Sequence, residues 1–368
     1  MHGVECVNTY RPSTVPDAAD FITVEGQQVI DLFIQHVQML CGGRAEIVNS
    51  LIAWLAHNVQ KPGSKIRWAP LIKGVEGDGK TLFGHFAEAA MGSPNVKSIS
   101  PTVLGTDFSD WAHGACVGVL EEIKLTGHNK YDILNKIKPY VTNNSVPVHP
   151  KGGKEFTVIN TMNYVAFTNF SDALPIGDTD RRWMVVFTPF GNISELSEYV
   201  IGNGWANAGA YFDALYSGAV AHRASLRRWL LDYPISAQFK ADGSAPMTDE
   251  KLQMVALSAS PEDQVVLEAI SEGGVGVASN VLSTSCLSAA CALLDADVNL
   301  ATTRVNHALG RLGWSKVAQK LKWKGMSHRV WVKGKVPSDT EALRSILDKT
   351  LEKVPTPFEK GDELDDLF

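Results

Sequence analysis

The chain has 368 residues, more than one hydrophobic core usually organises, so two or three packed units are expected. Apolar residues make up 45% of the sequence and charged residues 20%. No apolar run approaches the roughly 20 residues that a membrane span needs, so a membrane protein is not expected. The segment Met1–Pro12 has neither a basic head nor an apolar stretch, so we expect a cytoplasmic protein without a secretory signal.

The cysteine content argues against a disulfide framework and against a zinc site, because the number is odd and no CxxC spacing occurs. We expect reduced thiols at Cys6, Cys41, Cys116, Cys286 and Cys291. The net charge of -6, taken alone, argues against a nucleic-acid binder. How charge is distributed along the chain matters more than this total.

The pattern of apolar residues changes along the chain. Between Gly26 and Gln60 they recur at three- and four-residue spacing, which predicts a helical N-terminal lobe over residues 1–66. Residues 67–245 alternate short apolar runs with helical or loop segments, which is typical of an α/β sheet domain. The turn-rich segment FKADGSAPMT then predicts a domain boundary near residue 245.

A phosphate-binding motif, GVEGDGKT, stands between the strand-like APLIK and the helix-like LFGHFAEAA. Its glycines let backbone N–H groups face phosphates, and the helix N-terminus adds a favourable potential. Lys80 is expected to reach the β and γ phosphates of ATP, and Thr81 to ligate Mg²⁺. A chance glycine-rich turn is the alternative, which the flanking strand and helix disfavour. The predicted nucleotide-binding residues are Gly74, Gly77, Asp78, Gly79, Lys80 and Thr81.

A second apolar segment, Cys116–Glu122, ends in two carboxylates and complements this motif. Glu121 is predicted to hold the magnesium shell, and Glu122 to polarise the attacking water. The alternative is a strand that simply ends in solvated acids.

Two further polar positions follow. Asn169 ends the apolar segment NYVAFTN, where a sensor residue would touch the γ-phosphate or its water, although asparagine after a strand also commonly begins a turn. Arg181 and Arg182 precede another apolar segment, and arginine suits the charge spread over phosphate oxygens. Either could act as an arginine finger or form a structural salt bridge.

Four segments, GVEGDGKT, VGVLEE, VPVHPKGGKEF and NYVAFTN followed by DRRW, together resemble the superfamily 3 AAA+ helicases of the phage and poxvirus primase-helicase type. They cover about residues 68 to 190. The resemblance implies an AAA+ P-loop core and a homo-oligomer, a hexameric ring with ATP bound between subunits. It also implies that a hairpin at Val146–Val158 grips single-stranded DNA in the central pore, and that a phage-encoded protein works in a bacterial host cell.

The hairpin segment itself contains two short strands around a Lys-Gly-Gly-Lys turn. His149, Lys151 and Lys154 are predicted to contact the nucleic-acid backbone, with a plain surface hairpin as the alternative. Only about 65 residues precede the motor region, and they hold no carboxylate cluster or zinc pattern. We therefore expect either a helicase without its own primase domain or the excised helicase part of a longer protein.

Residues 246–336 combine three helical segments with a two-strand alternation, which predicts a winged-helix-like domain. From Arg304 to Lys335 there are nine Lys or Arg and no Asp or Glu. This is an electrostatic footprint of nucleic-acid binding, with Thr302–Leu312 as the recognition helix and Lys316–Lys335 as the wing. Alternatively the lysines form a solvated face. The interleaved tryptophans, expected in the core, are Trp314, Trp323 and Trp331.

Residues 337–368 are acidic and low in core-forming side chains, so a disordered tail is expected. It could dock on a replication partner or only aid solubility. The whole sequence predicts an ATP-dependent helicase or translocase in phage or mobile-element replication, acting on single-stranded or forked DNA. The alternative is an ATP-dependent origin-binding initiator or loader; a small-molecule kinase is disfavoured. Translocation polarity, DNA or RNA preference and oligomer number stay open.

Overall fold

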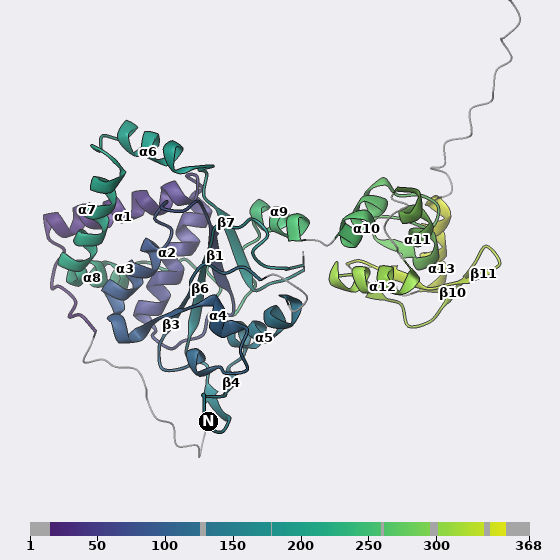
Figure 1. Ribbon diagram of the computed structural model, residues 1–368, viewed down its shortest axis with the longest axis horizontal. Coiled ribbons are helices and arrows are strands. Elements are labelled where there is room, and N and C mark those ends of the chain that lie inside the picture. Colours follow the sequence, from purple (N-terminus) through teal and green to yellow (C-terminus); the bar gives the residue numbers. More distant parts are fainter. Residues whose placement is uncertain are drawn as a thin grey trace, which may run out of the picture. The chain divides into compact units, whose positions relative to one another are not determined.

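A computed structural model of the protein describes residues 15–125, 130–177, 179–258, 261–294, 301–334 and 339–350. The chain forms two compact units (Figure 1). The first holds residues 1–176 and 180–258, and the second holds residues 177–179 and 259–368. In the part of the chain that is described, no helix combines the length and apolar character needed to cross a membrane.

The first unit is built on a fully parallel five-stranded sheet of order β2-β3-β6-β1-β7. Parallel pairing places the carboxyl ends of all five strands at one edge, where ligands bind in sheets of this kind. β3 and β6 are buried along their whole length, which explains their continuous apolar sequences. The strands are β1 (Ala69–Lys73), β2 (Val96–Ile99), β3 (Val117–Leu120), β6 (Asn163–Thr168) and β7 (Trp183–Phe187).

Side chains alternate between the two faces of this sheet and enter two separate cores. Val165 and Phe167 enter the core beneath one helical layer, and Tyr164 and Ala166 enter the other core. The first layer comprises α1 (Val24–Leu40), α2 (Ala45–Gln60), α3 (Leu82–Met91), α6 (Ile193–Gly202), α7 (Ala208–Ala221) and α8 (Arg223–Asp232). The second face is covered by α4 (Pro101–Leu104), the 3-10 turn Asp110–Ala112, α5 (Lys130–Thr142) and α9 (Asp249–Ser258).

This packing corrects two predicted domain boundaries. The predicted helices near the N-terminus exist, and α1 and α2 bury their apolar faces in the same core as the sheet, so these two helices belong to the first unit. The first unit also continues beyond residue 245, because α9 packs on β7. Met254 of α9 is fully buried in the second core, and Thr248 Oγ1 donates to the carbonyl of Val185 at 2.6 Å.

The predicted hairpin is confirmed. β4 (Ser145–Val148) and β5 (Phe156–Ile159) pair antiparallel, with Val146 opposite Val158, and form a small sheet of their own. In Figure 1 this hairpin projects from the body of the first unit. The hairpin is therefore a protruding element attached just before β6.

The second unit contains the predicted order of three helices followed by strands. It adds a short strand, β8, that the sequence analysis did not predict, and its sheet has the antiparallel order β8-β12-β9. Its elements are α10 (Pro261–Glu272), β8 (Val281–Ser283), α11 (Thr284–Leu294), α12 (Thr302–Arg311), β9 (Ser315–Lys316), β10 (Leu321–Trp323), β11 (Met326–His328), β12 (Val330–Val332) and α13 (Thr340–Lys349). The tryptophans Trp314, Trp323 and Trp331 are buried, as expected of core residues.

The prediction of disorder from residue 337 is wrong for α13. Leu343 and Leu347 lie on one face of this helix and are buried beside Trp323, whose indole N–H donates to Asp348 at 2.8 Å. The sequence analysis relied on the acidic composition of this segment and overlooked its amphipathic spacing. Leucines four residues apart share one face of a helix. Residues 351–368, the remainder of the predicted tail, lie outside the described residues.

Leu343→Ala tests this packing. Because the side chain is buried in a folded core, the substitution should lower the free energy of unfolding of the full chain by about 2–5 kcal/mol, measured by urea denaturation with tryptophan fluorescence. Leu293→Ala is the matched control, since Leu293 is 90% exposed on α11. Equal effects of the two substitutions would contradict the packing of α13.

Candidate functional site: a nucleotide-binding edge and a basic hairpin

The GVEGDGKT segment joins β1 to α3 at the carboxyl edge of the sheet. Gly77 and Gly79 both have φ near +80°, a backbone conformation that residues with a Cβ atom rarely adopt. The amide of Gly74 donates to the carbonyl of Thr168 at 3.0 Å, which fastens the loop to the end of β6. The loop therefore begins beside the adjacent strand and ends at a helix N-terminus, the arrangement that suits an anion.

Lys80 and Asp78 are both buried within the loop. The Nζ atom of Lys80 donates to the carbonyl of Val75 at 2.9 Å and lies 3.5 Å from Asp78 Oδ1. The Asp78 carboxylate accepts from the Lys80 amide at 3.1 Å and from the Thr188 hydroxyl at 3.0 Å. The Asp78 side chain thus supports the loop from inside, and only its backbone is available to a phosphate. Thr81 is exposed at the start of α3.

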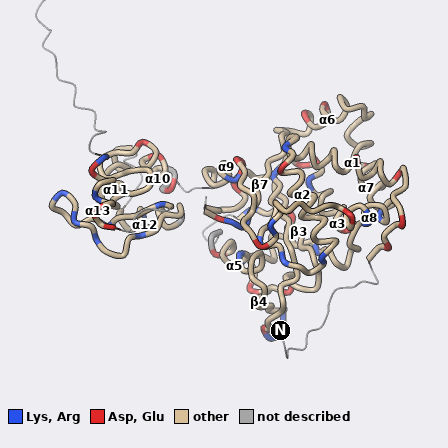
Figure 2. Tube along the Cα trace, turned by 180° about the vertical axis from the view of Figure 1, so that it is seen from behind, with Lys and Arg blue, Asp and Glu red and all other residues tan. Residues whose placement is uncertain are grey.

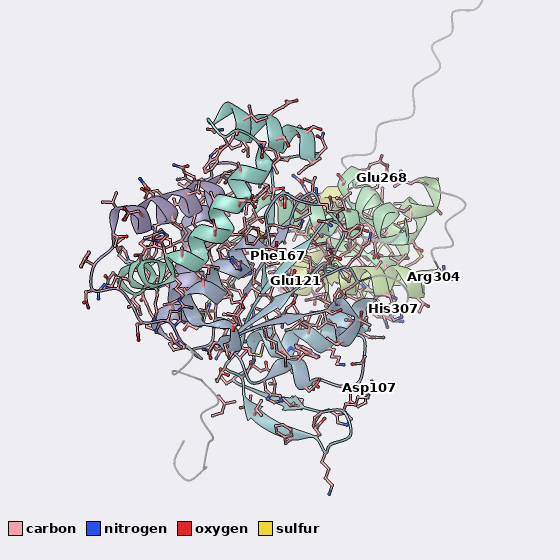
Figure 3. All side chains as sticks on the ribbon, turned by 60° about the vertical axis from the view of Figure 1, so that its left-hand side comes forward. Asp107, Glu121, Phe167, Glu268, Arg304 and His307 are labelled. Carbon is pink, nitrogen blue, oxygen red and sulfur yellow. The ribbon has the colours of Figure 1, made fainter. Side chains whose placement is uncertain are left out.

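The two predicted carboxylates follow β3, two strands away from β1. Burial raises the pKa of Glu121, the neighbouring charge of Glu122 raises it further, and the Lys80 ammonium partly offsets this. Lys80 and Glu121 are therefore electrostatic neighbours although 41 positions separate them in the sequence. Figure 3 shows Glu121 beside Phe167 inside the first unit, and the amide of Ile123 donates to the Phe167 carbonyl at 2.9 Å.

Glu122 has a φ of +45°, one of two non-glycine residues with positive φ among those described. Such strain persists only where surrounding structure enforces it, and it is concentrated at functional sites.

Asn169 follows β6, the strand between β1 and β3. Its side-chain oxygen is buried and has no hydrogen-bond partner among the described residues. A buried acceptor without a partner indicates a donor supplied from elsewhere, such as water or a ligand. Loop amides, a lysine, two carboxylates and this amide therefore meet at one edge. These are the kinds of donor and acceptor that a nucleoside triphosphate with Mg²⁺ would require.

The arginine pair lies at the opposite edge of the sheet. Trp183, the first residue of β7, pairs with Ala69, so Arg181 and Arg182 flank the start of β1, roughly 16 Å of strand away from the loop at its end. Arg182 forms an ion pair with Asp180 at 3.3 Å. Arg181 is exposed and makes no ion pair within the described part of the chain.

Residues 245–251 hold the backbone beneath Arg181 in place. The amide of Ala245 donates to the Arg181 carbonyl at 2.8 Å, and the buried Lys251 ammonium donates to the carbonyl of Asp180. Arg181 is thus an exposed guanidinium on a fixed backbone, whereas Arg182 is engaged within its own chain.

The three predicted nucleic-acid contacts on the hairpin are not equivalent. Lys151 and Lys154 are exposed in the loop between the strands, whereas His149, the first residue of that loop, is half-buried. The His149 amide donates to Ser109 Oγ at 2.9 Å, and its ring lies 5.4 Å from that of Phe108, between centroids. In Figure 3 the loop that carries Asp107 lies beside the hairpin. The hairpin is therefore anchored where its connecting loop begins, and the loop presents two lysines outward.

His36, which the sequence analysis missed, also contacts the loop. It is fully buried on α1, where its Nε2 lies 3.0 Å from the Gly79 carbonyl oxygen and its Nδ1 lies 3.0 Å from the Tyr211 hydroxyl. Burial lowers the pKa of His36 to about 4. In the sequence this histidine is a lone polar residue within an amphipathic helical pattern, so no local signal indicates its contact with the loop.

The part of the chain that is similar to known proteins contains these elements. Residues 72–182, from β1 to the arginine pair, match a family described as a family of unknown function, DUF5906. Over 189 residues the chain is 23% identical to the DNA primase-polymerase of Nitratiruptor phage NrS-1, a match that covers 50% of this chain and 25% of that protein. The chain thus spans about a quarter of the length of this curated relative.

Solved structures extend the likeness to most of the chain. The apo structure of the NrS-1 C-terminal region (305–718) matches with a TM-score of 0.61 and 16% identity, and covers 88% of this chain and 79% of that one. A second structure of the region, the A form, gives a TM-score of 0.58 at 16% identity, covering 88% of this chain and 78% of that one. The protein therefore has the mixed α/β fold of this C-terminal region, with a parallel central sheet.

Proposed function

We propose that this protein is an ATP-driven motor that translocates on and unwinds DNA during phage replication. One observation carries the proposal: Lys80, Glu121 and Asn169 come from three neighbouring strands and meet at one edge, where the Asn169 oxygen lacks a partner among the described residues. The parallel sheet, with the phosphate loop after β1 and the acidic pair after β3, supports the AAA+ core that the resemblance to superfamily 3 helicases implies.

Each group has a defined task in ATP hydrolysis. Loop amides and Lys80 would bind the β and γ phosphates, and Thr81 and Glu121 would hold a Mg²⁺ ion, which would supply positive charge beside the phosphate oxygens. Glu122 orients and polarises the attacking water, and Asn169 holds that water or the γ-phosphate. The catalysis is positioning and electrostatic stabilisation, because phosphoryl transfer needs little covalent help from the protein.

The arginine geometry supports ATP bound between subunits. Arg181 lies at the opposite edge of the sheet from its own phosphate loop, so it can approach only a nucleotide held by another copy of the chain. A homo-oligomer that places the two edges face to face would complete the site. A closed ring satisfies every such interface, and the hexamer follows from the family resemblance.

The proposed nucleic acid is single-stranded or forked DNA, gripped by Lys151 and Lys154. The name of the NrS-1 relative, a DNA primase-polymerase, supports a role in phage DNA replication, and thus in the cytoplasm of a bacterial host. The alternative is that these two lysines are solvated surface residues that do not contact DNA.

A second candidate function, an origin-binding initiator or loader, is favoured by the second unit. Figure 2 shows Lys and Arg along the β10–β11 hairpin and acidic residues on α10. The exposed cations include Lys320, Lys322 and Lys324. We propose that this unit is a winged helix, with α12 as recognition helix and the β10–β11 hairpin as wing, because it combines three helices with a three-stranded sheet and a basic hairpin after the third helix.

Steady-state ATP hydrolysis, measured with and without single-stranded DNA, tests the motor. We expect stimulation by DNA, and a loss of about 100-fold or more in Lys80→Ala and in Glu122→Gln, because each removes a group acting on the phosphates or the water. Slow hydrolysis that is indifferent to DNA would favour the initiator or loader.

Mixing inactive variants tests the role of Arg181 in trans. Arg181→Ala alone should be as inactive as Lys80→Ala, yet an equal mixture should regain on the order of a quarter of wild-type hydrolysis, because randomly mixed interfaces can combine an intact loop with an intact arginine. Arg182→Ala alone should keep most activity and lose stability, since its partner is Asp180. No recovery on mixing would contradict a shared site.

The paired substitution Lys151→Ala/Lys154→Ala tests the hairpin. It should abolish unwinding and reduce the salt dependence of single-strand binding by a slope of about 1.4, since two phosphate contacts are lost. Lys320→Ala/Lys322→Ala is the matched pair on the second unit and should leave unwinding intact. The reverse result would assign DNA binding to the second unit and support the initiator.

A further inference from the structure

The phosphate loop touches the helical layer at Gly79. A Cβ added to Gly79 would lie 2.5 Å from Phe212 Cε1 and 2.8 Å from His36 Cε1, and the residue has a φ of +79°. Glycine is therefore required here both by conformation and by close approach. The helices that approach it, α1 and α7, lie far from the loop in the sequence.

The hydrogen bonds fix the tautomer of His36. A carbonyl oxygen can only accept, so the Nε2 atom 3.0 Å from the Gly79 oxygen must carry the proton. In the neutral ring Nδ1 is then an acceptor, and the Tyr211 hydroxyl, 3.0 Å away, must donate to it. Complete burial keeps the ring neutral near neutral pH, because it lowers the pKa to about 4. Tyr211 thus selects the tautomer that donates to the loop.

This bond also fixes the direction of the next amide. A peptide unit is planar and trans, so the Gly79 carbonyl and the Lys80 N–H point in opposite directions. Holding the carbonyl against α1 turns the Lys80 N–H into the loop, where it meets Asp78 Oδ1 at 3.1 Å. The same Asp78 carboxylate accepts from the Thr188 hydroxyl, so the Gly79–Lys80 peptide is held on its carbonyl side by α1 and on its N–H side by a buried carboxylate.

We propose that His36, oriented by Tyr211, is a positioning residue that holds the Gly79–Lys80 peptide, and with it the phosphate loop, in the conformation that receives the phosphates of a bound nucleotide. The inference rests on the proposed ATP site. It assigns a role to a histidine that contacts neither nucleotide nor Mg²⁺, and acts through the loop backbone.

The test is nucleotide affinity of the full chain, measured with a fluorescent ATP analogue. His36→Leu should weaken binding about tenfold, because the Gly79 carbonyl keeps only the Leu82 amide as a donor and the loop loses its hydrogen bond to α1. His36→Gln should restore affinity to within about threefold of wild type, since a glutamine amide can donate from near the Nε2 position. Tyr211→Phe, which keeps the ring and removes the tautomer-selecting hydroxyl, should weaken binding by an intermediate factor of about three.

His57→Leu is the matched control. His57 is also buried on a helix of the same layer, but its ring packs 5.7 Å from Phe239, between centroids, rather than against the loop. A loss of affinity in His36→Leu without a loss in His57→Leu, at comparable thermal stability, is the expected result. Equal changes in both, or no rescue by glutamine, would overturn the positioning role. If the wild-type protein binds no nucleotide, the proposed ATP site itself fails. Should His36→Leu not fold, the glutamine and Tyr211→Phe variants still decide.

Discussion

The parallel pairing of β1, β6 and β3 is the constraint on which the candidate site depends. Ala166 of β6 lies opposite Leu71 of β1 on one side and Leu120 of β3 on the other. This register aligns the carboxyl ends of the three strands. The register is strongly determined, because a slip of one residue would exchange the side chains of the two cores. The phosphate loop, the acidic pair and Asn169 gather at one edge because the strands that carry them end there together.

The site combines this rigid scaffold with local strain and buried charge. Glu122 is held with a positive φ, and the Asp78 carboxylate is fully buried inside the loop. Each feature alone would raise the free energy of the folded state. Hydrogen bonds from Thr188 and Lys80, together with packing, offset the free-energy cost of burying the Asp78 carboxylate. The helical layer adds His36 against Gly79. The geometry of the loop is therefore enforced from two sides, by the sheet edge and by the helices.

The two edges of the sheet are linked by β6. At its amino end, Asn163 accepts from the Ile66 amide at 2.7 Å and donates to Asn58 and Ser64, which fixes the strand just after the basic hairpin. At its other end, Asn169 faces the proposed phosphate site. One buried strand thus connects the hairpin proposed to hold DNA with the amide proposed to sense ATP. In the proposed motor, this strand is a direct physical link between the site of hydrolysis and the DNA-binding hairpin.

Several features were predictable because their signals are contiguous in the sequence. The loop motif, the acidic strand end, the hairpin and the helices of both units each depend on local spacing or composition, and the α/β class follows from their order. The roles of the individual site residues remain predictions.

Other features required the tertiary structure, because they depend on residues far apart in the sequence. His36 meets Gly79 across 43 positions and Tyr211 across 175, and no local pattern encodes such contacts. The inward orientation of Asp78 depends on Thr188, and the distinction between Arg181 and Arg182 depends on which guanidinium reaches Asp180. The sequence by itself determined which chemical groups are present and in what order. Only the packing of distant segments decided which groups meet, because burial and close contact are properties of the folded chain.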